Sequence, residues 1–405
     1  MARSEILVGV EVGTSKVCAV VAESMRNEDL RILGAGLVPS KGVRKGEVVD
    51  LKLATECLHD ALSKAEMNSN IEIDDVAVAI TGSHIASFTN RGGITIPEGY
   101  MAIDEQALRD VAIKAREVSL PDDHTFLHSI IQHYYVDNQP GVLNPLGLIG
   151  RRLEADVHII HGAKARVQNT LRCVDSQEVK IEEVVSGGLA SSHAVLNDNQ
   201  REMGALLIDI GGGVSDYIVF TEGVVNKSGV LAVGGDHVNN DISLGLRIPL
   251  TRAEKLKIEE GSALIGQSLP GEKITLKNDA GFSGKEIERE MLNTIIHARI
   301  EEMFTLIHKQ VMAGISVHEL RAGVFLTGGC SLLRGIREVA ESVFDLPVHL
   351  AHDTGVSGPT PILNNPVYST AIGVARFVQT RRAEEGDPSP IRTVWDQMKK
   401  LFGMK

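Results

Sequence analysis

Two segments of the chain, residues 6–21 and 206–220, share one layout: a strand, a short glycine-bearing turn and a second strand. Their apolar runs are rich in β-branched residues and have the length of strands, so each segment is predicted to be a β-hairpin. Glycines in such a turn let backbone N–H groups converge on an anion. The repetition therefore predicts two related halves with a phosphate-bearing ligand, a nucleotide, clamped between them.

Both turns contain residue types that suit phosphate binding. Hydroxyl groups and one lysine add to the backbone donors of the glycines. The candidate residues are Gly13, Thr14, Ser15 and Lys16 in the first turn, and Gly211, Gly212 and Gly213 in the second. For either segment alone an ordinary glycine hairpin is the alternative, but two copies with one layout favour a ligand site. A Walker-type loop is excluded because the chain has no G-x-x-x-x-G-K-[ST] string.

A third glycine segment follows a strand-like run at residues 323–327. Gly328 and Gly329 come directly after this run, and an amphipathic helix is expected to follow them. A helix N-terminus offers free N–H groups and the positive end of the helix dipole. We therefore expect Gly328, Gly329 and Ser331 to contact a phosphate or a nucleoside.

In this order the three segments resemble the phosphate-1, phosphate-2 and adenosine motifs of the actin/Hsp70/sugar-kinase superfamily. Within it the chain is similar to the FtsA family of bacterial cell-division proteins, also through residues 43–50, 187–192 and 368–376. The resemblance implies an α/β, actin-like two-lobed fold of duplicated ribonuclease-H-like domains. It also implies an inserted subdomain in the first lobe, a C-terminal amphipathic helix, and ATP and Mg²⁺ as cofactors.

The pattern of strands and helices, with this resemblance, divides the chain into two lobe cores and two excursions. The excursion at 83–165 (1C) has an expected helix near 104–118 and strands near 126–136 and 152–161. The excursion at 236–308 (2B) should cap the cleft with two helical segments and a Gly/Pro-rich stretch at 266–284. The other divisions are 1–82, 166–205 and 361–380 for the first core (1A), 206–235 and 309–360 for the second core (2A), 381–390 for a flexible linker, and 391–405 for a terminal helix.

Two carboxylates are candidates for a metal site. Asp209 follows three apolar residues in a buried strand, where a carboxylate is costly unless it meets a cation or hydrogen-bond donors. We therefore expect Asp209 to contact Mg²⁺ or its waters. Glu11 stands where most superfamily members have a metal-facing aspartate, so its role, through water, follows from the resemblance. Asp216 is left open between the site and the cap of a turn.

Other polar residues are assigned to the nucleotide by resemblance. Gly234, Gly235 and Asp236 resemble a further phosphate contact, with a plain turn as the alternative. Glu254 and Lys257 lie three residues apart on one helix face and resemble adenine and ribose contacts. A surface ion pair between these two side chains is the alternative.

The segment at Gly187 and Gly188 bears on catalysis. Hydrolysing relatives such as Hsp70 and MreB have a glutamate at this position, whereas here no side chain is available to orient water. General-base catalysis contributes about 10² to 10⁴ in rate. We therefore expect ATP binding with slow or undetectable hydrolysis, and we assign no catalytic residue.

The composition limits the class of partner that the protein could bind and the cellular compartment in which it would fold. A net charge of −12 argues against a nucleic-acid partner. The four cysteines lack C-x-x-C spacing, which favours a reduced cytosolic compartment, and we expect neither a signal peptide nor a spanning helix. A histidine metal site is the less favoured interpretation of the inserted segment, and packed or solvated side chains are the simpler one. The histidines concerned are His124, His128, His133, His158 and His161.

The C-terminal segment has the pattern of a membrane-surface helix. Apolar residues recur there at helical spacing, and four basic residues against one acidic residue give residues 391–405 a charge of +3. A basic amphipathic helix with Trp and Phe is typical of an interfacial anchor, and docking on the protein's own surface is the alternative. The expected membrane residues are Ile391, Val394, Trp395, Met398, Lys399, Lys400, Leu401 and Phe402.

The resemblance implies a role in the bacterial division ring. It implies polymerisation with other copies of the chain on the cytoplasmic face of the membrane at the septum, and tethering of FtsZ filaments to that anionic surface. Arg299 matches a basic position that would bind the acidic C-terminal tail of FtsZ, and residues 83–165 would bind other division proteins. The alternatives are an ATP-hydrolysing chaperone, a sugar kinase or an MreB-like filament. The insertion and the terminal segment favour FtsA.

Overall fold

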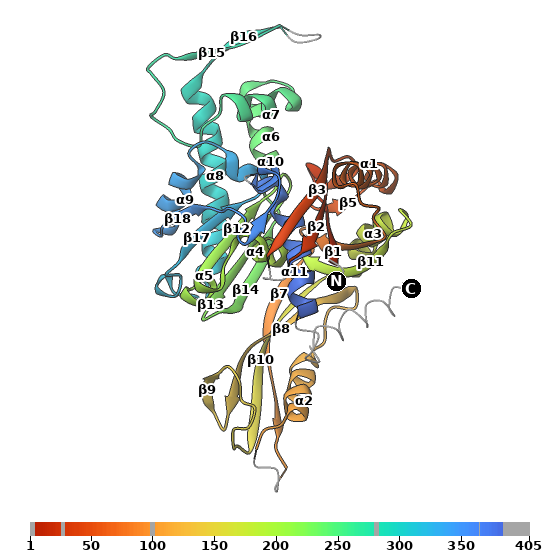
Figure 1. The fold of residues 1–405 in the computed structure, drawn as a ribbon. Helices are drawn as coiled ribbons and strands as arrows, with labels where there is room; N and C mark the ends of the chain where they lie inside the picture. Colours follow the sequence, from red (N-terminus) through yellow and green to blue (C-terminus); the bar gives the residue numbers. More distant parts are fainter. Residues whose placement is uncertain (1–4, 26–28, 98–101, 279–282, 364, 384–405) are drawn as a thin grey trace.

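Each of the two repeated hairpins is part of a mixed sheet, and the two sheets have similar strand arrangements (Figure 1). The structure is a computed structural model that describes residues 5–25, 29–97, 102–278, 283–363 and 365–383. The first sheet has the order β11-β6-β1-β2-β3-β19 and the second has the order β14-β13-β12-β17-β18. In each, three antiparallel strands continue into parallel ones, so the duplicated two-lobed α/β fold is confirmed.

The strands of these sheets are short and mostly buried. Those of the first sheet are β1 (Glu5–Val12), β2 (Lys16–Ser24), β3 (Leu30–Pro39), β6 (Asp75–Ile80), β11 (Lys180–Ser186) and β19 (Val356–Ser357). Those of the second are β12 (Ala205–Ile210), β13 (Ser215–Thr221), β14 (Val224–Leu231), β17 (Gly323–Thr327) and β18 (Val348–Leu350). A small ribbon of β4 (Val43–Arg44) and β5 (Glu47–Val48) leads into the first helix.

The two hairpins have the same register and the same turn. In the first, the Gly13 N–H donates to the Lys16 carbonyl oxygen over 2.9 Å. In the second, the Gly211 N–H donates to the Val214 carbonyl oxygen over 3.0 Å. Each turn is therefore closed by a glycine N–H bonded to the carbonyl of the third residue after it.

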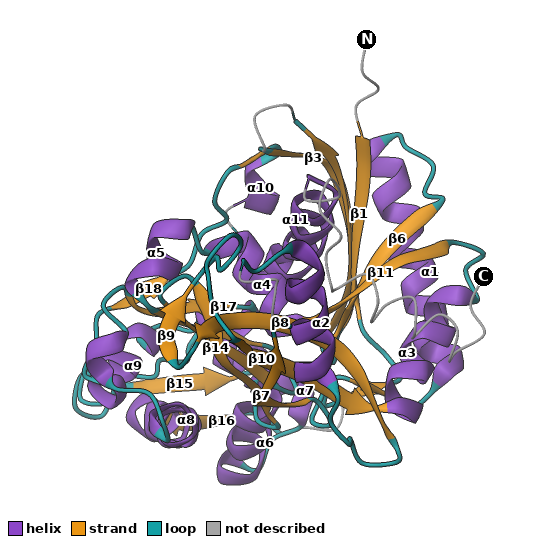
Figure 2. Cartoon of the chain, turned by 90° about the horizontal axis from the view of Figure 1, so that it is seen from below, coloured by secondary structure: helices purple, strands orange, loops and turns teal. Residues whose placement is uncertain are grey.

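Two helices, α4 (Gly187–Val195) and α11 (Ser369–Ala383), lie between the two sheets (Figure 2). Their buried side chains form one apolar cluster with residues of both sheets, from Leu7 of β1 to Phe325 of β17. The helix backbones approach closely, since a Cβ added at Gly373 would lie 1.8 Å from the Ala190 carbonyl oxygen. Only glycine fits at that position. The opposite face of the first sheet is covered by α1 (Leu51–Ser69) and α3 (Lys164–Asp175).

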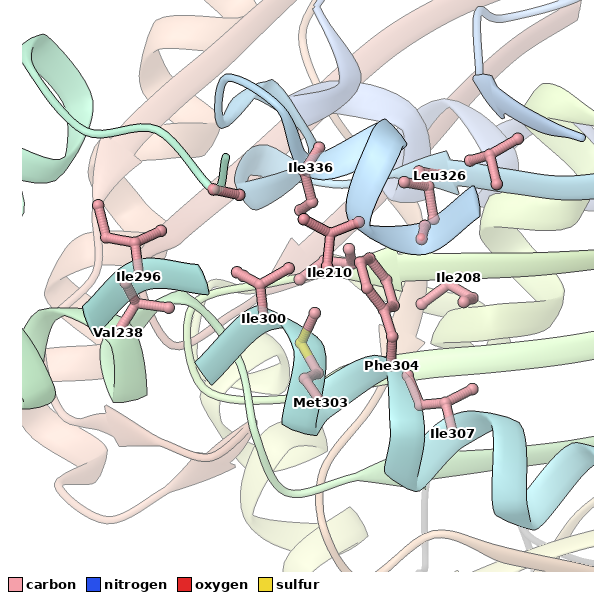
Figure 3. Packing of buried hydrophobic residues seen from close by; sticks show 14 of the residues in the cluster. Ile208, Ile210, Val238, Ile296, Ile300, Met303, Phe304, Ile307, Leu326 and Ile336 are labelled. Carbon is pink, nitrogen blue, oxygen red and sulfur yellow. The ribbon is translucent and has the colours of Figure 1, made fainter. Parts of the chain in front are cut away.

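The second lobe packs its sheet against a helical layer. Figure 3 shows Ile208 and Ile210 of the sheet against Ile300, Phe304 and Ile307 of a long helix. The helices of this lobe are α5 (Asp198–Met203), α6 (Gly235–Leu246), α7 (Leu250–Glu259), α8 (Arg289–Met312) and α9 (Ile336–Phe344). The expectation of two helical segments in 236–308 is wrong: α6, α7 and α8 are three. The Gly/Pro-rich stretch contains β15 (Lys273–Leu276), which pairs with β16 (Lys285–Glu288) directly after the stretch.

The inserted segment forms a four-stranded sheet with one helix, α2 (Glu105–Arg116), and extends from the lobes in Figure 1. Its strands are β7 (Ala86–Thr95), β8 (His124–Val136), β9 (Gln139–Val142) and β10 (Arg152–Ala163), in the order β7-β10-β8-β9. The expectation of two strands is therefore incomplete. β7 contains Gly92 and Gly93, and a Cβ at Gly92 would lie 2.4 Å from the Ala115 backbone of α2. Glycine is a poor strand residue, and the close approach of α2 explains why it is needed at position 92.

This subdomain also contacts the second lobe. The Ser87 hydroxyl donates to the Ser228 carbonyl oxygen over 2.6 Å, and the His158 Nε2 atom lies 2.8 Å from the Ser228 hydroxyl. The Gln132 amide donates to the Val225 carbonyl oxygen over 2.7 Å. The edge strand β14 of the second lobe is thereby joined to the inserted sheet.

The remaining short elements are α10 (Thr360–Leu363) and three 3₁₀ turns, at Val317–Glu319, Gly329–Leu332 and Pro366–Tyr368. No helix in the described ranges combines the length and apolarity needed to cross a bilayer. The expected membrane helix, residues 391–405, lies outside the described residues, as does most of its linker.

We predict that Gly373→Ala destabilises the protein by about 1–3 kcal/mol, because the added methyl group would overlap the Ala190 backbone. The matched control is Gly188→Ala on α4, where the nearest atom to an added Cβ is 3.5 Å away. Chemical denaturation of both variants tests this expectation. A Gly373→Ala midpoint equal to those of the control and the wild type would contradict the close helix contact.

Candidate functional site

A cavity of about 410 Å³ lies between the two lobes, and both hairpin turns line it. The turns meet face to face: a Cβ at Gly212 would lie 2.9 Å from the Ser15 Cβ atom, and one at Gly213 would lie 2.5 Å from the Thr14 hydroxyl oxygen. Glycine is needed at 212 and 213 because the opposite turn approaches so closely. The cavity therefore lies where the two copies of the hairpin face each other.

Most of the residues that the sequence assigns to a nucleotide line this cavity. They are Glu11, Gly13, Thr14, Ser15, Lys16, Asp209, Gly211, Gly212, Gly213, Gly235, Asp236, Glu254, Lys257, Gly328 and Gly329. Gly234 and Ser331 lie outside the lining. The N–H groups of the two residues after Gly234 donate to the carbonyl oxygens of Gly211 and Gly212, which joins the two loops. The buried Ser331 hydroxyl donates to the Gly328 carbonyl oxygen over 2.7 Å and closes that turn.

The third glycine segment differs from the expected geometry. Gly329–Leu332 forms a 3₁₀ turn, and α9 begins only at Ile336. The N-terminus of an α-helix therefore does not follow the double glycine directly. Gly328 has a φ of 82° and faces Asp209: an added Cβ would lie 2.3 Å from the Asp209 Oδ1 atom. Glycine is required there by both the backbone conformation and the neighbouring carboxylate.

Three buried carboxylates gather on the floor of the cavity. Asp209 and Asp216 are direct partners across the second hairpin, so their side chains share one face of the sheet. The Asp209 Oδ2 atom accepts hydrogen bonds from the hydroxyls of Ser191 and Thr370. The Thr81 hydroxyl lies 2.9 and 2.7 Å from the two carboxylate oxygens of Asp216. Sequence reasoning left Asp216 open, and the structure places it in the cavity.

The third carboxylate, Glu11, pairs with the ammonium group of Lys16. Burial raises the pKa of Glu11, although Lys16 opposes that shift. Burial and the neighbouring charge of Asp209 raise the pKa of Asp216 to about 8, against the effect of the Thr81 hydrogen bond. Confined carboxylates raise one another's pKa because like charges repel in a dry environment. A cation placed among them would relieve that repulsion.

Sequence reasoning missed the hydroxyl residues Thr81, Ser191 and Thr370. Each lies in a segment whose partner is distant in sequence, so local pattern gave no signal. The sequence does contain a signal for Asp216. A four-residue turn at 211–214 pairs Ile210 with Ser215, and this register places Asp216 opposite Asp209. The equivalent pairing in the first hairpin joins Glu11 and Cys18.

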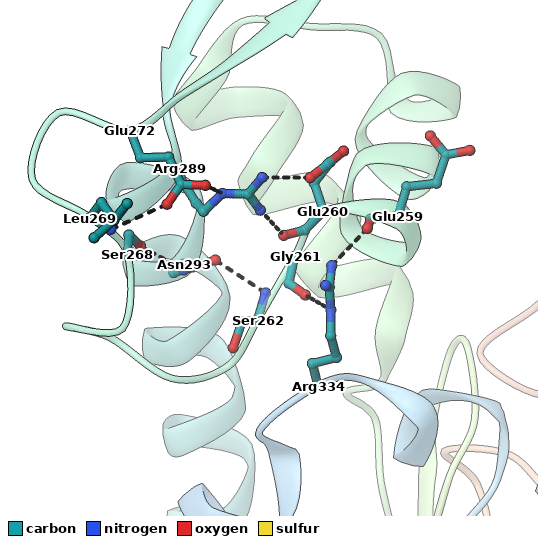
Figure 4. Close-up of polar contacts among 10 residues, drawn as sticks. All are labelled: Glu259, Glu260, Gly261, Ser262, Ser268, Leu269, Glu272, Arg289, Asn293 and Arg334. Carbon is teal, nitrogen blue, oxygen red and sulfur yellow. Dashed lines mark hydrogen bonds and ion pairs between the residues drawn. The ribbon is translucent and has the colours of Figure 1, made fainter.

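One wall of the cavity is formed by α7, which polar contacts fix in place (Figure 4). Arg334 donates to the carbonyl oxygens of Glu259 and Gly261, which joins the end of α7 to the third glycine segment. Arg289 pairs with Glu260 at 2.7 Å and with Glu272 at 2.6 Å. These bonds hold the side chains of α7 over the opening.

Within this wall, Lys257 donates to the Gly235 carbonyl oxygen over 3.1 Å. On the same helix, Lys255 pairs with Glu259 at 3.8 Å. Ile258 of α7 and Leu332 of the 3₁₀ turn also line the cavity, although they are 68% and 60% exposed. The cavity lining therefore includes exposed apolar side chains from both of these elements.

The candidate partner residue Arg299 lies on α8, away from the cavity lining. Its Nε atom is 2.5 Å from Asp241 of α6, and its Nη1 atom contacts Glu302. These contacts raise the pKa of Arg299, first through the Asp241 hydrogen bond. An outside carboxylate would have to compete with two internal ones.

The histidines of the inserted subdomain make separate contacts. His128 accepts from the Ser186 N–H over 2.9 Å, and the Nδ1 atoms of His124 and His161 lie 2.7 Å apart. Among the described residues, no group of three or more His, Cys, Asp or Glu side chains could hold a metal ion.

The chain resembles several solved structures in fold. A PilM-PilN type IV pilus biogenesis complex has a TM-score of 0.63 at 15% identity, with 91% of this chain and 97% of that chain covered. MreB5 of Spiroplasma citri, bound to ADP, has a TM-score of 0.55 at 14% identity, with 95% and 99% covered. Similarity at this level of identity establishes the actin-like fold alone.

Sequence comparison is more specific. The family model for cell division protein FtsA matches residues 206–373, and the model for the SHS2 domain inserted in FtsA matches residues 82–161. Cell division protein FtsA of Pseudomonas aeruginosa is 35% identical over 92% of this chain and 89% of its own length. The Escherichia coli K12 protein of that name is 32% identical, with 92% and 90% covered. The chain therefore belongs to the FtsA family of cell-division proteins.

Proposed function

We propose that the chain binds ATP with Mg²⁺ in the cavity between its lobes. The observation that carries this proposal is the meeting of two glycine turns, one from each lobe, around about 410 Å³ of space. Pockets for small ligands have volumes of about 300–1,000 Å³. The MreB5 neighbour, which shares the fold, is described as bound to ADP.

The donor set of the cavity fits Mg²⁺ held jointly with phosphate. Mg²⁺ keeps several waters and is usually bound through one or two carboxylates plus substrate phosphates. Asp209 and Glu11 would supply those carboxylates through water. The bound ion would neutralise phosphate charge next to the buried acids. Lys16 would turn from Glu11 toward the phosphate or stay between the two.

The mouth of the cavity fits a nucleoside. Ile258 and Leu332 line the cavity and are exposed, so a base bound beside them would remove apolar surface from water. Glu254 and Lys257 lie on the same helix as Ile258 and would contact the adenine or the ribose. The two glycine turns would then hold the phosphates at the inner end.

Hydrolysis should be slow, because Gly187 or Gly188 stands at the position of the glutamate of hydrolysing relatives and has no side chain to orient water. A Cβ at Gly187 would lie 3.1 Å from the Asp216 Oδ1 atom, so Asp216 occupies the space that a side chain at 187 would need. In the ligand-free protein, burial and the charge of Asp209 raise the pKa of Asp216 to about 8.

The cellular role that we propose is that of a membrane tether for FtsZ. Membership in the FtsA family supports polymerisation of the chain on the cytoplasmic face of the membrane at the division septum. Residues 83–165 would bind other division proteins, and 236–308 would bind the FtsZ tail. A chaperone, a sugar kinase or an MreB-like filament is less favoured, because the relatives over most of the chain are cell-division proteins named FtsA.

For the nucleotide, we expect the purified protein to bind ATP in the presence of Mg²⁺ and to release phosphate far more slowly than about one per second, the lower end of ordinary enzyme turnover. Asp209→Asn should weaken binding, because it removes the carboxylate charge. Fluorescence titration and a phosphate-release assay measure the two quantities. Turnover above one per second would overturn the expectation of slow hydrolysis.

For the FtsZ tail, Arg299→Glu should weaken binding of a fluorescent tail peptide by roughly tenfold, because the charge that would pair with the peptide is reversed. Asp241→Asn should strengthen binding, since Arg299 would lose an internal competitor. Arg337→Glu on α9 is the matched control, because Arg337 also pairs with neighbouring acids. Equal affinities for the Arg299 variant and the wild type would exclude Arg299 from the interface.

For the membrane, Trp395→Glu or deletion after Ser389 should abolish co-sedimentation with anionic liposomes while the lobes stay folded. Apolar burial contributes about 25 cal/mol per Å², and each basic residue near an anionic surface adds about 1 kcal/mol. Circular dichroism of the truncated protein checks its folding. If the truncated chain pelleted with vesicles as well as the full chain, the anchor would lie elsewhere.

A further inference from the structure

Asp209 is held from the opposite lobe. It lies on β12 of the second lobe, whereas Ser191 lies on α4 and Thr370 on α11, the two helices between the sheets. The Thr370 hydroxyl donates to the Asp209 Oδ2 atom over 2.9 Å, and the Ser191 hydroxyl donates to the same oxygen. All three side chains are at most 8% exposed. One carboxylate oxygen is therefore bonded by two hydroxyls across the lobe boundary.

The helix packing fixes the positions of the two hydroxyls. Ser191 follows Ala190, whose carbonyl oxygen is the atom closest to an added Cβ at Gly373, and Thr370 lies one turn before Gly373 on α11. The two hydroxyl oxygens are 3.3 Å apart. On the other side, Gly328 leaves room for the Asp209 Oδ1 atom, which a Cβ there would approach to 2.3 Å. The carboxylate is confined on both sides.

Asp216, the partner of Asp209 across the hairpin, has the same kind of support. It also belongs to the second lobe, and the Thr81 hydroxyl that bonds it follows β6 of the first lobe. Two acids of one lobe are thus oriented by hydroxyls of the other.

We propose that Ser191 and Thr370 are positioning residues that orient Asp209 toward the cation of a bound magnesium nucleotide. The inference rests on the proposed function of the cavity. Mg²⁺ demands near-ideal octahedral geometry, so the rotation of a carboxylate that reaches its waters matters. The two hydroxyls bond the Oδ2 atom of Asp209 and so fix the rotation of its carboxylate. The Oδ1 atom accepts no bond from these hydroxyls.

A purely structural role would give a different result. If the hydroxyls only satisfied a buried carboxylate, their loss would lower stability and weaken nucleotide binding equally with and without Mg²⁺. If they orient Asp209, the loss appears in the magnesium-dependent part of binding. Comparing affinity with and without the ion separates these two roles.

The experiment uses the full chain with the variants Thr370→Val, which keeps the shape and removes the donor, and Ser191→Ala. Binding of a fluorescent ATP analogue is titrated once with Mg²⁺ and once with EDTA. We expect each variant to bind about tenfold more weakly than the wild type with Mg²⁺ and about equally in EDTA. Thr370→Ser, which restores the hydroxyl, should recover binding with Mg²⁺.

Thr380→Val is the matched control, because the Thr380 hydroxyl, also on α11, donates to the Arg376 carbonyl oxygen of its own helix. Thermal denaturation of every variant shows whether it is folded, and Ser191→Ala tests the proposal if Thr370→Val unfolds. Unchanged affinity with Mg²⁺, or an equal loss in both conditions, overturns the proposal. A wild-type chain that binds no nucleotide would instead contradict the proposed function of the cavity, and this inference with it.

Discussion

The contact between α4 and α11 is the constraint on which the site depends. Gly373 lets the two helix backbones meet at Ala190, and a second glycine, Gly9, brings α11 against β1, where an added Cβ would lie 2.0 Å from the Ala371 carbonyl oxygen. This helix pair contributes to an apolar cluster with both sheets. The facing of the two hairpin turns, and the hydroxyls that reach Asp209, follow from that packing. A change in the contact between α4 and α11 would therefore alter the positions of the residues that line the cavity.

The repeated hairpin made much of this architecture predictable. Its apolar runs and glycines indicated both sheets, and the register of Asp209 with Asp216 follows from the length of the turn. The lining residues of the two turns were also identified from the sequence. What the sequence concealed depends on distant segments: β7, whose glycine meets α2, the 3₁₀ turn after Gly329, and the hydroxyl donors to Asp209. Local patterns do not record such tertiary contacts.

The strand β14 connects two parts of the molecule that carry different proposed roles. It bonds to the inserted subdomain through Val225 and Ser228, and the chain after its end leads to Gly235 and Asp236, the first residues of α6, at the cavity. The strand therefore lies between the proposed nucleotide site and the proposed surface for division proteins.

We propose that the chain is an ATP-binding scaffold that assembles on membrane. Electron microscopy of the purified protein with ATP on anionic lipid monolayers, beside the same protein without lipid, tests it most directly. We expect filaments on the lipid and none in its absence. A monodisperse monomer on the lipid, combined with rapid ATP turnover in solution, would contradict it and favour an enzyme on the same fold.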